Sequence, residues 1–256
     1  PEERCALMAE EGIEQVLILP FDLSIAALQP AEFFRRILID TLGARAVCVG
    51  DNFHFGQQKA GQVDLLRGLG AELGVKVEIV EAITRRGAVV SSSEIRRLID
   101  SGNVSRAGRL LERPYSMSGD VVRGEGRGSK ETVPTLNLEV SSLDSAERAL
   151  PAKGVYITRT LDTASNRRWA SITNVGDRPT FGGGHLTIET FLLDELCPPT
   201  PSRIRLEFFR RVREEKRFDD AGALKAQIMT DIARARAFFR RVIREQIAEP
   251  TLPPLP

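Results

Sequence analysis

The sequence predicts an α/β unit with a parallel sheet, followed by a six-stranded antiparallel β-barrel and a C-terminal helix. Across residues 1–112, helical and extended patterns alternate, and strands separated by helices form parallel βαβ units. After Arg113-Pro114 the helical period ends, and about six short β-rich runs follow at the spacing of a closed barrel. These changes predict domains at 1–112 and 113–249, and a disordered Pro-rich tail at 250–256.

The elements of the first domain can be placed in order along the chain. Pro30 is expected at the first turn of a helix, Gly43 just after its end, and Ser91 or Ser92 as the N-cap of a later helix. Helical patterns cover residues 2–12, 30–41, 63–73, 91–99 and 104–111. Short apolar strands are expected at residues 15–20, 46–50 and 75–80.

The elements of the second domain are predicted from runs of alternating apolar and polar residues and from a helical pattern at the end of the chain. The expected strands are Tyr115–Val122, Thr135–Val140, Gly154–Thr160, Arg168–Asn174, Thr187–Leu193 and Ile204–Phe209. Asp219 or Asp220 can cap the final helix. Its apolar face, which we expect to pack on the barrel, consists of Leu224, Ile228, Ile232, Phe239 and Ile243.

Composition excludes several classes of protein. A formal net charge of +1 does not indicate a general polyanion binder. The three cysteines are far apart and form no CxxC pair, which favours a reducing compartment and argues against a structural zinc site. No apolar run approaches the ~20 residues of a membrane span. We therefore expect a cytoplasmic protein without a nucleic-acid or membrane partner; the sequence leaves the oligomeric state open.

A glycine-rich segment follows the first strand of the predicted barrel. Gly124, Gly126 and Gly128 stand at alternate positions, where the backbone can approach a ligand closely. Free N–H groups, with Arg127 and Lys130, could cradle phosphates, although the spacing is not that of a Walker A loop. The alternative is a glycine-rich hairpin turn.

The next strand begins Pro134-Thr135-Leu136-Asn137. Residues i and i+2 of a strand point to the same face, so the Thr135 hydroxyl and the Asn137 carboxamide should lie together. Two neutral oxygen ligands suit Mg²⁺, which completes its coordination with waters and ATP phosphates. An ordinary strand start after proline is the alternative.

A carboxylate lies in the alternating strand 187–193. Glu189 shares its face with Phe191 and Leu193. A carboxylate among apolar neighbours is either an ion-pair partner or a working base, and a base must reach the proton that it removes. In phosphoryl transfer to an alcohol, that proton is on the acceptor hydroxyl.

In this order the three segments resemble riboflavin kinase, the flavokinase module of bacterial riboflavin kinase/FAD synthetases. The resemblance runs from about Arg113 to Ala237. It implies a six-stranded barrel with a C-terminal helix that makes FMN from riboflavin and ATP. It further implies that Thr135 and Asn137 hold Mg²⁺ and that Glu189 activates the terminal ribityl hydroxyl. The nucleotide phosphates would be lined by Gly126, Gly128, Lys130 and Thr135.

The resemblance also covers the charged segment Arg213–Asp219, which matches the part of the family that closes over the flavin. Arg213, Lys216 and Phe218 are its implied flavin contacts. Without the resemblance, this segment would be read as a solvated run of charges.

The first domain resembles the Rossmann-like nucleotidyltransferase (FMN adenylyltransferase) domain of bifunctional members of the family. Residues 49–56 resemble its Gly-Asp-Asp-Phe-x-Phe-Gly element, and residues 90–96 resemble its Ser-Ser-Thr-x-Ile-Arg element. Ser91, Ser92, Ser93 and Arg96 at a helix N-terminus would form a site for ATP phosphates, the alternative being a serine cap with surface arginines.

The domain's His-x-x-His or His-x-Gly-His signature, whose imidazoles stabilise charge developing on phosphates, does not occur in the chain. We therefore expect the chain to lack the opening of a truncated adenylyltransferase domain. On this expectation the parent protein converts FMN to FAD, and the chain as written does not.

Three alternatives remain beside the kinase interpretation. One is a nucleotidyltransferase of another substrate class with an accessory barrel. A second is a flavin-binding protein with an inactive kinase site, which the presence of Thr135, Asn137 and Glu189 disfavours. The third is a nucleic-acid-binding barrel, disfavoured because aromatic stacking residues are scarce, at 6% of the chain. The nucleic-acid-binding interpretation is suggested by five arginines near the end of the barrel sequence, Arg203, Arg205, Arg210, Arg211 and Arg213.

Overall fold

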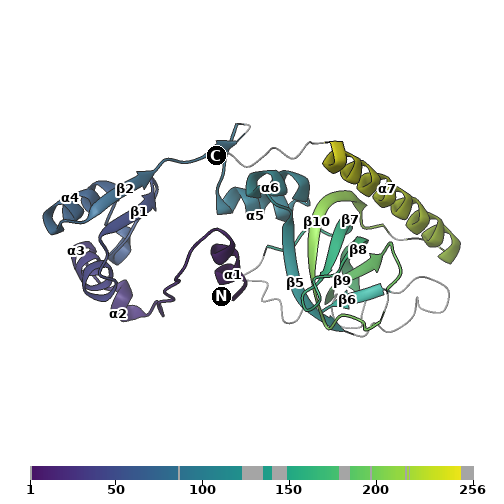
Figure 1. Ribbon diagram of the computed structural model, residues 1–256, viewed down its shortest axis with the longest axis horizontal. Helices are drawn as coiled ribbons and strands as arrows, with labels where there is room; N and C mark the ends of the chain where they lie inside the picture. The colour runs from purple at the N-terminus through teal and green to yellow at the C-terminus, as the bar shows by residue number, and fades with distance from the viewer. Residues whose placement is uncertain are drawn as a thin grey trace. The chain divides into compact units, whose positions relative to one another are not determined.

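The computed structural model of the chain describes residues 2–85, 87–122, 135–139, 149–178, 185–196, 198–216, 218 and 220–248. The chain forms two compact units, Pro1–Thr84 and Arg85–Pro256, each of which is described by itself (Figure 1). The domain limits 1–112, 113–249 and 250–256 follow the change in sequence pattern and stay predictions. No helix within the described ranges combines the length and the apolar character needed to cross a membrane.

The first unit is built on a parallel pair of strands, β1 (Ala46–Gly50) and β2 (Lys76–Val80), in register from Ala46↔Lys76 to Gly50↔Val80. Helix α4 (Val63–Leu73) makes the crossover between them, as the βαβ pattern predicts. The other elements are α1 (Glu2–Glu10), α2 (Leu23–Ala26), α3 (Pro30–Phe33), η1 (Phe34–Thr41) and η2 (Gln57–Lys59). Its buried core consists of Phe34, Phe55, Leu66 and Val75.

The strand predicted at residues 15–20 is wrong. This segment has no regular secondary structure, and Leu17 and Ile18 are 50% and 64% exposed. An apolar run becomes a strand only where a neighbouring strand completes its backbone hydrogen bonds. Among the described residues, β1 pairs with β2 alone in this sheet, so the parallel sheet has two strands instead of the predicted three.

The helix predicted from Pro30 to Thr41 has the predicted extent but not a uniform pitch. Pro30 opens α3, and from Phe34 the chain continues as the π-helix η1. Gly43 follows with φ of +59°, and its N–H donates to the Ile39 carbonyl at 2.9 Å. The left-handed glycine after the helix end is therefore confirmed.

The second unit contains the barrel, which closes in the strand order β10-β5-β6-β9-β8-β7 (Figure 1). All of the barrel pairings are antiparallel, which confirms the predicted architecture. Its strands are β5 (Tyr115–Val122), β6 (Thr135–Leu138), β7 (Gly154–Asp162), β8 (Arg168–Arg178), β9 (His185–Leu192) and β10 (Arg203–Glu214). The short pair β3 (Thr84–Arg85) and β4 (Ala88–Val89), and helices α5 (Ser92–Asp100) and α6 (Val104–Leu111), precede the barrel.

The barrel interior is partly polar. Apolar side chains from every strand fill most of it, including Met117, Leu136, Leu138, Tyr156, Val175, Ile188 and Leu206. Between them a chain of fully buried hydroxyls crosses three strands, in the order Thr160, Ser171, Thr158, Thr173 and Thr190. Each hydroxyl thus has the hydrogen-bond partner that a buried polar group requires.

The Thr173→Val variant is expected to lower the free energy of unfolding by about 1–3 kcal/mol. The Thr173 hydroxyl bonds those of Thr158 and Thr190 at 2.7 Å each, so valine leaves two buried hydroxyls short of a partner. Urea unfolding measures the loss. Thr163→Val, in the exposed turn after β7, is the control; equal stabilities of the two variants would contradict a cooperative hydroxyl chain.

Helix α7 (Ala221–Ala248) lies along the outside of the barrel (Figure 1). The Asp220 carboxylate accepts from the Ala223 N–H at 2.8 Å, which identifies Asp220 as the cap. Ile232 and Ala235 are buried against outward-facing residues of β7 and β8, such as Ile157 and Ile172. The outer face of the sheet is therefore covered at one end by α7.

Candidate functional site

One cross-strand row on the outer face of the barrel links the three predicted parts of the site. Asn137 on β6 is paired with Glu189 on β9, and Glu189 with Asn174 on β8. Asn174 is paired in turn with Val155 on β7, and Val155 with Arg213 on β10. Paired residues carry their side chains on the same face, and neighbouring strands lie about 4.8 Å apart. The row thus places the residues predicted to hold the metal, to act as the base and to contact the flavin on one outer face of the barrel, with the buried Val155 between Asn174 and Arg213.

The neighbours of this row confirm that it faces outward. Leu136 and Leu138 flank Asn137, Ile188 precedes Glu189, and Val175 follows Asn174; all four are buried in the barrel interior. Because side chains alternate along a strand, Asn137, Glu189 and Asn174 must point away from that interior. Phe191, two residues beyond Glu189, packs in the cluster beneath α7. Apolar side chains thus border the row beside Glu189, in the direction of β9.

Thr135 and Asn137 offer the oxygen donors predicted for Mg²⁺. Thr135 is exposed, whereas Asn137 is only 8% exposed, and its carboxamide makes no hydrogen bond with the described residues. Within the described ranges, no group of three or more His, Cys, Asp or Glu residues is placed to hold a metal ion. A sparse set of hard oxygen donors fits Mg²⁺, which keeps waters and takes phosphate oxygens, better than it fits a fully protein-ligated ion.

Glu189 is half-buried between two neutral carboxamides, those of Asn137 and Asn174. No second carboxylate stands opposite it in either neighbouring strand. A single carboxylate in this setting can accept a proton from a hydroxyl brought to the row. The arrangement is compatible with the predicted base.

Asn174 is a candidate site residue that the sequence did not reveal. Its Nδ2 lies 3.2 Å from the position that a Cβ on Gly176 would take, and that Cβ would also overlap the Glu215 carboxylate. Nearby, the Lys153 ammonium donates to Asp177, and this hydrogen bond raises the pKa of Lys153. Gly176 therefore leaves room where polar groups from β8 and the end of β10 converge.

The predicted flavin contacts lie on and just after the end of β10. The guanidinium carbon of Arg213 is 5.6 Å from the centroid of the Phe218 ring, and the Lys216 ammonium is 5.7 Å from it. Both cations are thus within cation–π distance of one half-buried ring. The structure brings these three residues together, and their role toward a flavin stays a prediction. The predicted phosphate-loop residues Gly126, Gly128 and Lys130 lie outside the described residues.

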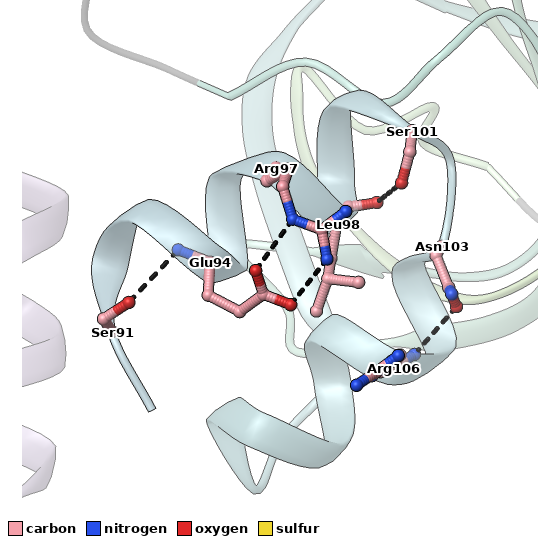
Figure 2. Close-up of polar contacts among 7 residues, drawn as sticks. All are labelled: Ser91, Glu94, Arg97, Leu98, Ser101, Asn103 and Arg106. Atoms are coloured by element: carbon pink, nitrogen blue, oxygen red, sulfur yellow. Dashed lines mark hydrogen bonds and ion pairs between the residues drawn. The ribbon is translucent and has the colours of Figure 1, made fainter. Parts of the chain in front are cut away.

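The serine-rich start of α5 is organised as a capped helix (Figure 2). Ser91 Oγ accepts from the Glu94 N–H at 3.2 Å, so Ser91 is the N-cap. Arg97 Nε donates to Glu94 Oε2 at 2.8 Å and Arg97 Nη2 donates to Glu94 Oε1 at 2.7 Å. These hydrogen bonds lower the pKa of the Glu94 carboxyl. Ser92, Ser93 and Arg96 are exposed. The predicted ATP contacts of Ser91, Ser92, Ser93 and Arg96 stay predictions.

The comparisons with known proteins agree with both units. A riboflavin kinase family model matches residues 111–239, and an FAD synthetase family model matches residues 1–94. The bifunctional riboflavin kinase/FMN adenylyltransferase of Pseudomonas fluorescens is 34% identical over 235 residues, which cover 91% of this chain and 73% of that protein. The protein of the same name from Escherichia coli K12 is 32% identical, with 93% and 74% covered.

A solved structure has the same architecture. It is described as a macrolide-efflux protein from Streptococcus pneumoniae and is similar with a TM-score of 0.80 and 27% identity, covering 92% of this chain and 74% of that one. The closed barrel, its C-terminal helix and the matched family model define a riboflavin kinase module. The chain belongs to the bifunctional riboflavin kinase/FMN adenylyltransferase family.

Proposed function

We propose that this chain transfers the γ-phosphoryl group of ATP to the terminal ribityl hydroxyl of riboflavin, giving FMN and ADP. The row that joins Asn137, Glu189 and Arg213 on one outer face carries the proposal. Along this row Arg213 is three strands away from Glu189, about 14 Å at the usual strand spacing. A tricyclic ring with a five-carbon polyol chain can bridge such a distance, with the ring at Arg213 and the hydroxyl at Glu189.

The reaction on this surface is an in-line displacement. The hydroxyl oxygen bonds to the γ-phosphorus as the bond from that phosphorus to the β-phosphate oxygen breaks, and Glu189 takes the hydroxyl proton. Thr135 and Asn137 would hold Mg²⁺, which supplies neutralisation of the phosphate charge. Positioning contributes much of the rate in phosphoryl transfer, and the rigid barrel strands supply it here.

Incubation of the chain with ATP, Mg²⁺ and riboflavin, followed by chromatographic separation of the flavins, tests the proposal. FMN that appears only with all three reactants is the expected result. Absence of FMN under conditions in which the protein is folded would overturn it. The same separation shows whether any FAD is formed from FMN.

Three of the five arginines that suggested a nucleic-acid-binding barrel make contacts within the protein, which supports a small-molecule substrate. Arg203 Nη1 pairs with Asp120 at 2.9 Å, and Arg213 Nε pairs with Asp231 at 2.8 Å. Arg211 donates to a main-chain carbonyl. Their charges are thus engaged within the protein instead of forming one surface for a phosphate backbone.

We expect Asn174→Ala to lower kcat about tenfold with little change in the KM for ATP. Asn174 lies between Glu189 and the Val155–Arg213 end of the row, where its carboxamide can orient the polyol chain. Asn174→Asp should be worse than alanine, because it adds a negative charge beside Glu189. Steady-state kinetics on both substrates measure the two effects; wild-type kcat in both variants would remove Asn174 from the site.

A further inference from the structure

We propose that Asp231 on α7 is a positioning residue for the flavin side of the site and acts through Arg213. The proposal rests on the proposed function, because Arg213 is a flavin contact only if riboflavin is the substrate. Asp231 itself does not belong to the cross-strand row and carries no role in the phosphoryl transfer described above. Its side chain is 4% exposed, so it acts on the ligand only through its neighbours.

The Asp231 carboxylate joins the helix to the barrel. Arg213 Nε, from β10, donates to Asp231 Oδ2 at 2.8 Å, and Gln227 Nε2, one turn earlier on α7, donates to Oδ1 at 2.9 Å. Arg234 is 4.0 Å away from Oδ1 and mostly exposed. The two short bonds occupy both carboxylate oxygens, which fixes the orientation of the carboxylate.

Arg213 transmits this orientation to the segment that follows β10. Its Nη1 donates to the Glu214 carbonyl at 3.0 Å, and its guanidinium lies within cation–π distance of Phe218. The guanidinium is planar, so fixing Nε and Nη1 fixes the whole plane. Its Nη2 makes no hydrogen bond with the described residues, and the side chain is 19% exposed. Asp231 therefore determines where that group points.

Docking of the helix alone does not require this ion pair. Ile232 and Ala235 already bury α7 against the barrel, and a buried ion pair is often no more stabilising than apolar residues of similar size. The ion pair with Asp231 instead holds the Arg213 side chain in one rotamer. A role in orienting Arg213 accounts for a charged residue at a position where packing needs none.

The test is a double-mutant cycle in the full chain, with the KM values for riboflavin and ATP as readouts. In Asp231→Asn only one side-chain atom can accept, so either Arg213 or Gln227 loses its acceptor. We expect the KM for riboflavin to rise about tenfold and the KM for ATP to change by less than about twofold. In an Arg213→Gln background, Asp231→Asn should raise the KM for riboflavin no further, because the residue through which it acts is gone.

Two further variants separate positioning from folding. Arg234→Gln removes the distant, exposed cation and should leave both KM values unchanged. Gln227→Met keeps the size of the side chain but removes one donor to Asp231, and should raise the KM for riboflavin slightly even if Asp231→Asn does not fold. An unchanged KM for riboflavin in Asp231→Asn or Gln227→Met, equal rises for both substrates, or additive effects in the double variant would overturn the proposal. A wild-type chain that makes no FMN would instead refute the proposed function.

Discussion

Glu189→Gln is expected to lower kcat for riboflavin phosphorylation by about 10²–10⁴-fold, the usual contribution of a positioned general base. Glutamine keeps the size and the hydrogen-bonding reach of the side chain but cannot accept the hydroxyl proton. Because Glu189 lies between the carboxamides of Asn137 and Asn174, a neutral amide there should leave the neighbouring strands undisturbed. Riboflavin should therefore still bind, and the loss should appear in kcat rather than in KM.

Rapid-quench measurement of FMN formation in a single turnover gives the rate of the chemical step, and equilibrium titration of flavin fluorescence gives the affinity. Glu195→Gln, an exposed carboxylate shortly after β9, is the matched control and should retain wild-type turnover. Near-normal turnover in Glu189→Gln would remove Glu189 as the base. A loss of riboflavin affinity equal to the loss in rate would assign it to binding.

The barrel could be predicted from the sequence because its strands alternate. Inward and outward residues differ in polarity along β5 and β9, and the structure has β5 at the predicted bounds, Tyr115–Val122. The last strand was expected to end at Phe209, yet β10 continues to Glu214. Register shifts between Phe208 and Arg210 and between Arg211 and Arg213 break the period, so the charged end of the strand resembles a loop in the sequence.

Pairing between distant strands is what the sequence could not supply. Glu189 and the pair Thr135–Asn137 could be selected from local alternation and from the resemblance to a family. The position of Asn174 between Glu189 and Arg213 depends on the registers of three strand pairs, which no local pattern encodes. The error at residues 15–20 has the same origin, because apolar composition favours a strand but does not provide its partner.

Asn137→Ala should raise the Mg²⁺ concentration needed for half-maximal turnover by about tenfold or more, the scale on which groups around a bound metal affect its affinity. The Asn137 carboxamide is buried and makes no hydrogen bond with the described residues, so alanine removes a candidate oxygen ligand without breaking a hydrogen bond among them. Its neighbours Leu136 and Leu138 keep the strand in the barrel core. The loss should therefore be one of metal affinity and not of folding.

Titration of turnover with Mg²⁺ at saturating riboflavin distinguishes these cases. If Asn137 is a ligand, saturating Mg²⁺ recovers most of kcat in Asn137→Ala, because Thr135 and the phosphates still hold the ion. Asn137→Asp should bind Mg²⁺ more tightly but turn over more slowly, since it places a second negative charge beside Glu189. Asn166→Gly is the control, because Asn166 lies in the turn between β7 and β8 with φ of +58°, which glycine adopts without strain. An unchanged Mg²⁺ requirement in Asn137→Ala would exclude Asn137 as a ligand.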